Sequence, residues 1–188
     1  MDMIWILVGV TVVLYIWYTR IIGRKNSALE ALSGIDVQLK KRSNLIPNIL
    51  TIAKRFMEHE KELLSTVTQL RTQTDNEYDA GDPIAVSEHL KSANALGGQM
   101  GRLMVSMEAY PDLKSDQTML QAQQTYNEVE AQISAARRFY NSSVTELNNS
   151  IEIFPGNLLA GFAKAKVMPF YETDEASKAP VDASTYLD

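Results

Sequence analysis

Residues 112–153 read DLKSDQTMLQAQQTYNEVEAQISAARRFYNSSVTELNNSIEI, and apolar side chains recur in them every three or four positions. The recurring positions are Met119, Ala122, Tyr126, Val129, Ile133, Ala136, Tyr140, Val144, Leu147 and Ile151. Because an α-helix brings residues three and four apart onto one face, this spacing predicts a single helix, capped by Asp112 or Ser115 and ending near Ile153. With a rise of about 1.5 Å per residue the helix is about 60 Å long, and its apolar stripe needs other helices to cover it.

The preceding residues 83–109 carry a second helical stripe. Its members are Val86, Leu90, Ala93, Met100, Met104 and Met107. Asp82 and Pro83 suit the N-cap and the first helical position, which defines the start of this helix. Tyr110-Pro111 ends it, because the residue before a proline avoids the helical conformation.

Residues 26–78 form a third periodic stretch. Its apolar positions are Leu29, Leu32, Leu39, Ile46, Ile49, Ala53, Phe56, Leu63, Val67 and Leu70. Two polar residues, Asp36 and Ser43, fall on the same face. The apolar residues before and after Pro47 keep the spacing of a single helix face, so we predict one continuous helix with a kink at the proline. A break near Ser43-Asn44 is the alternative.

The N-terminal segment has the composition of a membrane anchor. Met3–Thr19 contains no charged residue, and the apolar segment extends to about Gly23 if the Arg20 side chain snorkels. About 20 helical residues span the ~30 Å hydrocarbon layer of a bilayer. A cleaved signal peptide begins with basic residues and ends with small ones. Here Asp2 is acidic, and the large aromatic residues Tyr15, Trp17 and Tyr18 lie at the C-terminal end of the apolar segment. We therefore predict a retained transmembrane anchor.

The distribution of charge along the chain predicts how the anchor is oriented in the membrane and which class of partner is disfavoured. Arg20, Arg24 and Lys25 flank the C-terminal side of the anchor, and by the positive-inside rule they place the body in the cytoplasm and the N-terminus outside. Residues 1–55 carry eight Lys/Arg against three Asp/Glu, whereas residues 56–188 carry ten against twenty. This acidic body argues against nucleic acid as a partner. The lack of cysteine excludes disulfides and thiolate metal sites.

The whole pattern indicates one architecture. No stretch alternates as a β-strand does, so the predicted fold is all-α, an N-terminal transmembrane helix followed by an elongated antiparallel helical bundle. The expected divisions are an anchor over residues 1–24, a bundle over residues 25–170 and an acidic, extended tail over residues 171–188. Residues 157–166 are expected to form one short helix, and Phe170 and Tyr171 are the residues expected to pin the segment that follows.

The basic run KKR at residues 40–42 is the densest in the chain. A nucleic-acid surface needs a wider basic face with stacking aromatics, and only Lys54 and Arg55 are nearby. Lipid headgroups suit the membrane-flanking cations better, because Lys40 lies about 22 Å beyond Lys25 along a straight helix and the Debye length is about 8 Å. We therefore interpret the run as a solvated bundle face or as contacts to other helices.

Neither metal nor catalytic chemistry is indicated. His59 and His89 are the only histidines, and His59 with Glu62 on one helix face offers two ligands where a metal site needs three or four. We expect both histidines to be exposed polar residues and expect no cofactor. Glu108 and Asp112 flank a turn at which Tyr110 is expected to pack the corner, and no base, nucleophile or phosphate loop accompanies them. No catalytic residue is predicted, and the chain is not expected to be an enzyme.

One polar pair is expected inside the bundle. Asp36 falls on an apolar stripe, and Arg137 lies beside another. A carboxylate that faces a bundle core needs a partner, and arginine supplies a bidentate one. The hypothesis is that Asp36 pairs with Arg137 or Arg138 across helices and fixes their register.

Four segments, in this order behind one N-terminal anchor, resemble the LemA family of bacterial membrane proteins. They are SGIDVQLKKRSNLIPNIL (33–50), MEHEKELL (57–64), SMEAYPDLKSDQ (106–117) and EAQISAARRFYNSSVTELNNSIEIFPGN (130–157). The resemblance covers about residues 1–170. Its motif positions are Asp36, Gln38, Leu39, Arg42, Pro47, His59, Tyr110, Pro111, Asp112, Arg137, Tyr140, Asn141 and Pro155.

The resemblance implies an anchor with its tip outside and a cytoplasmic four-helix bundle. It implies no reaction, and one branch of the family is associated with magnetosome membranes. The four-helix count favours either a split of the helix over residues 26–78 or a helix that is continuous with the anchor.

These observations together predict a function class. We expect a non-enzymatic scaffold or adaptor at the bacterial inner membrane, whose partners are the lipid bilayer and other proteins. Assembly into a homo-oligomer is expected where long helices leave an apolar stripe uncovered. The alternative is a membrane-organising protein that acts on anionic lipid.

Overall fold

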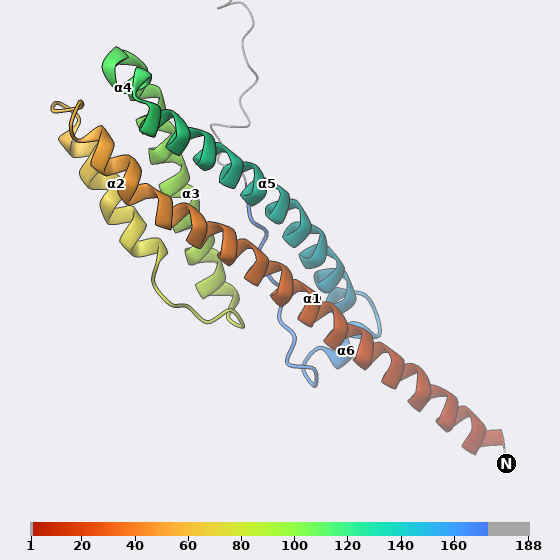
Figure 1. The fold of residues 1–188 in the computed structure, drawn as a ribbon. Helices are drawn as coiled ribbons and strands as arrows, with labels where there is room; N and C mark the ends of the chain where they lie inside the picture. Colours follow the sequence, from red (N-terminus) through yellow and green to blue (C-terminus); the bar gives the residue numbers. More distant parts are fainter. Residues whose placement is uncertain (1, 173–188) are drawn as a thin grey trace, which may run out of the picture.

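The computed structural model describes residues 2–172. Its elements are α1 (Asp2–Ala53), α2 (Lys61–Thr74), α3 (Pro83–Ser106), a 3-10 turn η1 (Met107–Ala109), α4 (Pro111–Ser115), α5 (Gln117–Glu152) and α6 (Gly156–Leu159). Figure 1 shows α1, α2, α3 and α5 side by side in alternating directions, with the N-terminal part of α1 extending alone from one end. The predicted all-α fold, an N-terminal apolar helix followed by an elongated bundle, is confirmed.

Two apolar clusters fill the bundle along its length. The first includes Leu32 of α1, Leu90 of α3 and Tyr140 of α5. The second includes Ile46 and Leu96 and lies closer to the turn between α1 and α2. The predicted stripes supply both clusters, as expected when amphipathic helices bury their apolar faces together.

α1 passes through Pro47 without interruption. A proline has no N–H to donate to the carbonyl four residues earlier, so the Ser43 carbonyl loses its helical partner. Arg71 of α2 replaces that partner, because its Nε donates to the Ser43 carbonyl oxygen over 2.9 Å. The neighbouring helix therefore supplies the hydrogen bond that the proline removes, and the chain does not break at Ser43-Asn44.

The single helix predicted over residues 26–78 is wrong. The chain turns at residues 54–60 and returns as α2, which packs on α3. Met57 in this turn is fully buried in the second cluster, together with Leu64 and Val67 of α2. A straight helix would leave these side chains beyond the bundle in water. The helical spacing of apolar residues continues through residues 54–60, so this spacing alone does not reveal the turn.

The start of α3 is as predicted. Asp82 has an extended backbone and is the N-cap, and its Oδ2 accepts a hydrogen bond from the Ala85 N–H over 3.3 Å. Pro83 occupies the first turn, where a missing N–H has no cost. Local sequence is therefore sufficient to determine where this helix begins.

The start of α5 differs from the prediction. Asp116 is the N-cap, in place of Asp112 or Ser115, and its Oδ1 accepts from the Met119 N–H over 2.9 Å. The two predicted residues belong to the separate short helix α4, which begins at Pro111. The corner between α3 and α5 is therefore built from two short elements, which prolong it beyond a simple turn.

The chain after α5 does not form the single helix predicted over residues 157–166. α6 covers only Gly156–Leu159, and turns follow as far as Lys164, whose φ of 46° lies in the left-handed region. Residues 165–172, which we call the strap, then run extended along α5. Tyr171 is buried and Phe170 is exposed, so Tyr171 is the one of the two that pins the strap. The tail predicted over residues 171–188 lies outside the described residues after Glu172.

Gly156 lies where α6 folds back over the end of α5, and a Cβ there would overlap the Ser150 carbonyl oxygen. We expect Gly156→Ala to lower the free energy of unfolding by about 1–3 kcal/mol, because backbone must shift to make room. Thermal unfolding measures the change. Gly161→Ala is the matched control, since a Cβ at that position meets nothing within 4 Å. Equal stability of the two variants would contradict the crowding at Gly156.

One helix within residues 2–172, α1, is long and apolar enough to cross a membrane. Its residues 2–16 are all exposed. The same helix then continues as the first helix of the bundle without a break, which is one of the two arrangements favoured by the four-helix count. The other, a split of residues 26–78, also occurs, at the turn after Ala53.

Candidate functional site

The basic run at residues 40–42 is divided among three environments. Lys40 Nζ lies 3.0 Å from Asp75 Oδ1, just after α2. Lys41 is exposed to solvent. Arg42 is buried, with 2% of its surface accessible. Lys40 and Arg42 therefore contact other parts of the bundle, while the Lys40 side chain, which is 61% exposed, and Lys41 also belong to a solvated face. Each of the two interpretations that the sequence left open describes part of the run.

Arg42 crosses the interior of the bundle and contacts two other helices. Its Nη2 donates to the Ala93 carbonyl oxygen of α3 over 2.7 Å, and its Nη1 donates to Glu130 Oε1 of α5 over 3.3 Å. Gly97 of α3 leaves room for the guanidinium, because a Cβ there would lie 3.1 Å from Nη1. One side chain thus joins α1, α3 and α5. Periodicity did not indicate this role, because Arg42 follows two surface lysines in the sequence.

Asp36 contacts two aromatic side chains. The Tyr78 hydroxyl donates to Asp36 Oδ2 over 2.8 Å, and His89 Nε2 lies 3.1 Å from Asp36 Oδ1. The Tyr78 and His89 rings are stacked, with centroids 4.1 Å apart. Burial raises the pKa of the Tyr78 hydroxyl well above its usual range, and the hydrogen bond to Asp36 raises it further. The three side chains connect α1, the loop after α2, and α3.

The prediction that His89 is exposed is wrong. Its side chain is 9% exposed, because Tyr78 covers one ring face and Asp36 binds the ring nitrogen. A cavity of about 380 Å³ opens beside these three residues, and Lys40 and Asp75 also line it. Within residues 2–172, no group of three or more His, Asp or Glu side chains is placed to hold a metal ion. The contacts of His89 hold α3 against α1.

The predicted pairing of Asp36 with an arginine is corrected by these contacts. Arg137 lies instead over the Tyr171 ring, with Cζ 4.3 Å from the centroid, and its Nη2 is 3.5 Å from Asn94 Oδ1. Arg138 is exposed. Asp36 does bridge helices, as proposed, but its partners are neutral or weakly basic aromatic groups from the loop and from α3. Sequence could not reveal this because those groups follow the turn that was not predicted.

Two asparagines of α5 hold the strap. Asn148 Nδ2 donates to the Met168 carbonyl over 3.0 Å, and Asn148 Oδ1 accepts from the Met168 N–H over 2.9 Å. Asn141 makes the same two bonds to Tyr171, at 3.0 and 2.8 Å. Seven helical residues span about 10.5 Å, and three extended residues span about 10 Å. The spacing of the two asparagines therefore matches the spacing of their targets, a match that becomes visible only when the strap is placed against α5.

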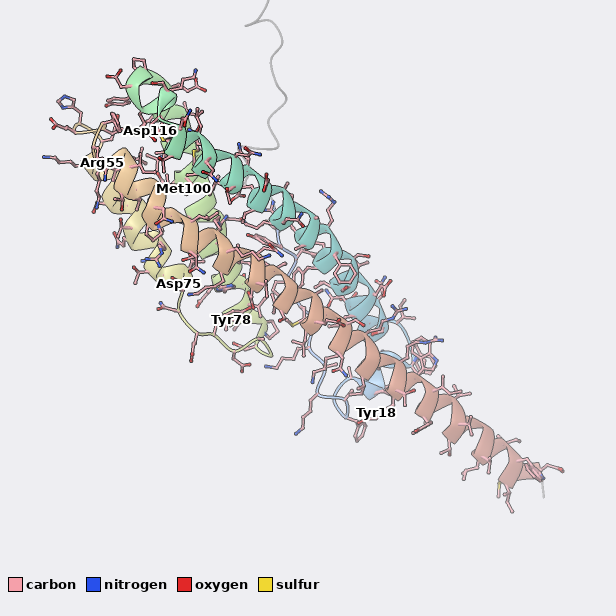
Figure 2. All side chains as sticks on the ribbon, viewed as in Figure 1. Tyr18, Arg55, Asp75, Tyr78, Met100 and Asp116 are labelled. Carbon is pink, nitrogen blue, oxygen red and sulfur yellow. The ribbon has the colours of Figure 1, made fainter. Side chains whose placement is uncertain are left out.

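Asp75 follows the C-terminal end of α2, where Figure 2 labels it, and holds this end of α2 against α1. It accepts hydrogen bonds from Lys40 and from Ser43 Oγ, at 3.0 and 2.9 Å, and Arg71 Nη2 lies 3.7 Å from its Oδ2. Burial acts to raise the pKa of Asp75. The hydrogen bonds and the positive charges of Lys40 and Arg71 outweigh burial, so the pKa lies below its usual range. The carboxylate is therefore stabilised in its charged form.

Replacing Asp75 with asparagine is expected to lower the free energy of unfolding by about 1 kcal/mol at neutral pH, because the amide loses its charged partners. A lowered native pKa means that the stabilisation is complete above the unfolded-state pKa of about 3.9 and is lost as the pH falls through the native pKa. The difference between wild type and Asp75→Asn should therefore shrink below about pH 4. Thermal unfolding as a function of pH measures it, with the exposed Glu77→Gln as control. A difference that is independent of pH would contradict the lowered pKa.

The membrane-flanking cations have partners within the protein. Arg20 lies over the Trp17 ring of the same helix, with its Cζ 5.5 Å from the ring centroid. Arg24 forms an ion pair with Glu146 of α5, and Lys25 Nζ donates to the Lys164 carbonyl oxygen over 3.0 Å. Arg24 and Lys25 therefore tie α1 to the end of α5 and to the turn before the strap, which is a role the sequence did not assign to them.

The remaining motif positions divide into packed and exposed residues. Wholly or partly buried are Gln38, Leu39, Pro47, Tyr110, Tyr140 and Pro155, and exposed are His59, Pro111 and Asp112. Tyr110 packs against the second cluster at the corner after α3, as predicted. The Tyr140 hydroxyl donates to the Pro169 carbonyl oxygen over 2.9 Å, which adds a further hydrogen bond to the strap.

Two grooves flank α2 at the end of the bundle that is far from the free part of α1. One, of about 820 Å³, lies beside the turn at residues 54–60. The other, of about 860 Å³, lies between α2 and α3 and includes Arg102 and Val105 in its wall. Figure 2 places Arg55 at this distal end and Tyr18 at the opposite end. The grooves thus present polar and apolar side chains together, at a distance from the apolar helix.

Comparison with known proteins connects this fold to one family. A family model described as the LemA family matches residues 31–184. Protein LemA of Metamycoplasma hominis is 27% identical over 177 residues, which cover 90% of this chain and 78% of the relative.

Relatives named as magnetosome proteins also match. Magnetosome protein MamQ 2 of Paramagnetospirillum magneticum is 24% identical over 170 residues. Magnetosome protein MamQ of Magnetospirillum gryphiswaldense is 25% identical over 169 residues. Each match covers 79% of this chain and 62% of the magnetosome protein, so these relatives are longer than the part that is shared.

Proposed function

The chain belongs to the LemA family, and from this membership we propose that it is a non-enzymatic scaffold or adaptor that holds partner proteins at a membrane. Family membership and the apolar N-terminal part of α1 support membrane association. A scaffold acts by raising the local concentration of its partners, so it needs a fixed position and an accessible surface.

The continuity of α1 is the observation that carries this proposal. The helix leaves its apolar segment near Gly23 and continues to Ala53 without a break. This length corresponds to about 45 Å. Arg24 and Lys25 brace the helix against the rest of the bundle. The bundle is therefore attached to the anchor by a packed helix, which fixes the distance between its far end and the membrane.

The grooves beside α2 supply the accessible surface. They lie at the distal end, so a partner there does not compete with the lipid bilayer for space. Val105 is 69% exposed in the wall of the groove between α2 and α3, and Arg102 beside it is also exposed. Arginine is enriched among the residues that contribute most to protein interfaces, and the exposed Val105 places apolar surface beside it.

Photo-crosslinking in cells tests the scaffold role. A photoreactive phenylalanine analogue at Val105 is expected to capture a discrete set of proteins, and Arg102→Glu in the same chain should abolish these adducts. Ser134, exposed on α5, is the control position. Adducts that are identical at Val105 and Ser134, or that survive Arg102→Glu, would contradict a binding surface in this groove.

The proposed location is the bacterial cytoplasmic membrane, with a single span, the N-terminus outside and the bundle in the cytoplasm. The native chain has no cysteine, so Ser134→Cys creates one reporter for an impermeant maleimide. Protection in intact spheroplasts and labelling after lysis are expected. Labelling of intact spheroplasts would reverse the orientation, and partners would then belong to the cell envelope.

The alternative of a membrane-organising protein acting on anionic lipid has less support. That alternative requires free cations beside the bilayer. In the structure Arg24 pairs with the Glu146 carboxylate, and Lys25 donates to the Lys164 carbonyl oxygen. Assembly into a homo-oligomer remains part of the scaffold proposal, and the mass of the detergent-solubilised chain measures it.

A further inference from the structure

The ion pair between Arg24 and Glu146 sets the register of α1 against α5. The two helices are antiparallel (Figure 1), so each residue of α5 after Glu146 lies beside an earlier residue of α1. α5 continues from Glu146 to Glu152, which adds about 9 Å. Its end is therefore level with about Tyr18, inside the apolar segment. We call this end of the bundle the base.

The base packs against the last turns of the apolar segment. Ile21 is fully buried and Trp17 is half-buried, whereas every other residue from 2 to 20 is exposed. The exposed part spans about 28 Å, and the hydrocarbon core of a bilayer is about 30 Å thick. If this part of α1 crosses the bilayer, its end lies close to the boundary between acyl chains and headgroups, and the base is held at that boundary.

The base carries apolar side chains that suit an apolar surrounding. Phe154 is 72% exposed and Phe162 is 80% exposed, and Ile153 and Leu158 are also exposed. Figure 1 shows α6 beside α1 where α1 leaves the bundle. The bond from Lys25 to the Lys164 carbonyl holds the turn after Phe162 close to the end of the apolar segment. Large apolar side chains therefore surround the emerging helix.

Charged residues limit how deep the base can lie. Glu152 is exposed on the last turn of α5, and Lys164 and Lys166 are exposed just after Phe162. These groups require headgroups or water, so the hydrocarbon interior is unfavourable for the base as a whole. Amphipathic elements with such a mixture lie about 5–10 Å into the boundary between headgroups and acyl chains. That depth is compatible with a base held beside the end of the spanning helix.

We propose that the segment Ile153–Phe162 inserts its apolar side chains into the surface of the same bilayer that α1 crosses. The protein then has two membrane contacts, the spanning helix and the base, and the second prevents the bundle from pivoting about the first. The inference rests on the proposed function only in requiring that α1 spans the membrane.

Single cysteines carrying an environment-sensitive fluorophore test the contact in the full chain, reconstituted at one copy per lipid nanodisc. Labels at Leu158→Cys and Phe162→Cys are expected to emit at shorter wavelength and to lose most of their fluorescence when the lipids carry bromine near the top of the acyl chain. A label at Val105→Cys, similarly exposed in the distal groove, should show neither effect. A label at Leu7→Cys reports on the spanning part of α1.

The four labels separate the possible failures. Quenching at Leu7 together with water-like emission at Leu158 and Phe162 would overturn the second contact and leave the anchor intact. A short-wavelength emission at Phe162 that brominated lipid does not quench would also overturn it, because protein would then be the cover. Absence of quenching at Leu7 would instead overturn the spanning helix and with it the membrane part of the proposed function.

Discussion

Arg42→Ala is expected to lower the free energy of unfolding by about 3 kcal/mol or more. The side chain is 3% exposed and joins three helices, so its removal leaves the Ala93 carbonyl without its bond and Glu130 without its charge partner. Breaking a buried ion pair on one side costs about 3–5 kcal/mol, and Glu130 is partly exposed, which favours the lower end. The melting temperature should fall by about 6–12 °C in detergent, measured by circular dichroism.

The adjacent cation supplies the control for this prediction. Lys41→Ala changes an exposed residue and is expected to alter stability by less than about 0.5 kcal/mol. A second comparison tests the charge itself, because Arg42→Met with Glu130→Gln removes both charges and should be more stable than Arg42→Met alone. If the Arg42→Ala variant were as stable as the Lys41→Ala variant, the guanidinium would not be what holds the bundle together.

Asn148→Leu is expected to release the strap from α5. The leucine fills similar space but leaves the Met168 N–H and carbonyl unpaired in a buried site, a loss of about 2–4 kcal/mol for the two bonds together. Because the strap follows the last described helix, it can detach while the helices stay paired, so the loss should appear as local opening and leave most of the helices folded. Amide exchange at Met168 should accelerate about 30-fold or more, and trypsin should cleave sooner after Lys166.

The neighbouring Asn149→Leu is the matched control, since Asn149 is exposed and makes no contact to the strap among the described residues. Its exchange at Met168 is expected to equal that of the wild type. Asn141→Leu should accelerate exchange at Tyr171 more than at Met168, because each asparagine holds one residue. Uniform acceleration over the whole bundle in Asn148→Leu would instead mean that the strap is part of the global folding unit.

The sequence indicated where contacts were needed more reliably than it identified the partners. Asp36 falls on an apolar stripe, and its need for a cross-helix partner was correctly inferred. The partners proved to be Tyr78 and His89, because the turn at residues 54–60 returns the chain and brings the loop after α2 to Asp36. Arg42 was grouped with its lysine neighbours for a similar reason, since adjacent helical residues point in different directions and only the neighbouring helices decide which is buried.

The sequence by itself determined the features that depend on residues within about four positions of each other. These are the all-α class, the apolar faces, the cap at Asp82 with Pro83, and the apolar length of α1, because helical periodicity and capping are local. Only the tertiary structure decided the turn after Ala53, the burial of Arg42, and the match of Asn141 and Asn148 to the strap. Each of these depends on the register between elements distant in the chain, which is set by long-range packing and leaves no short-range pattern.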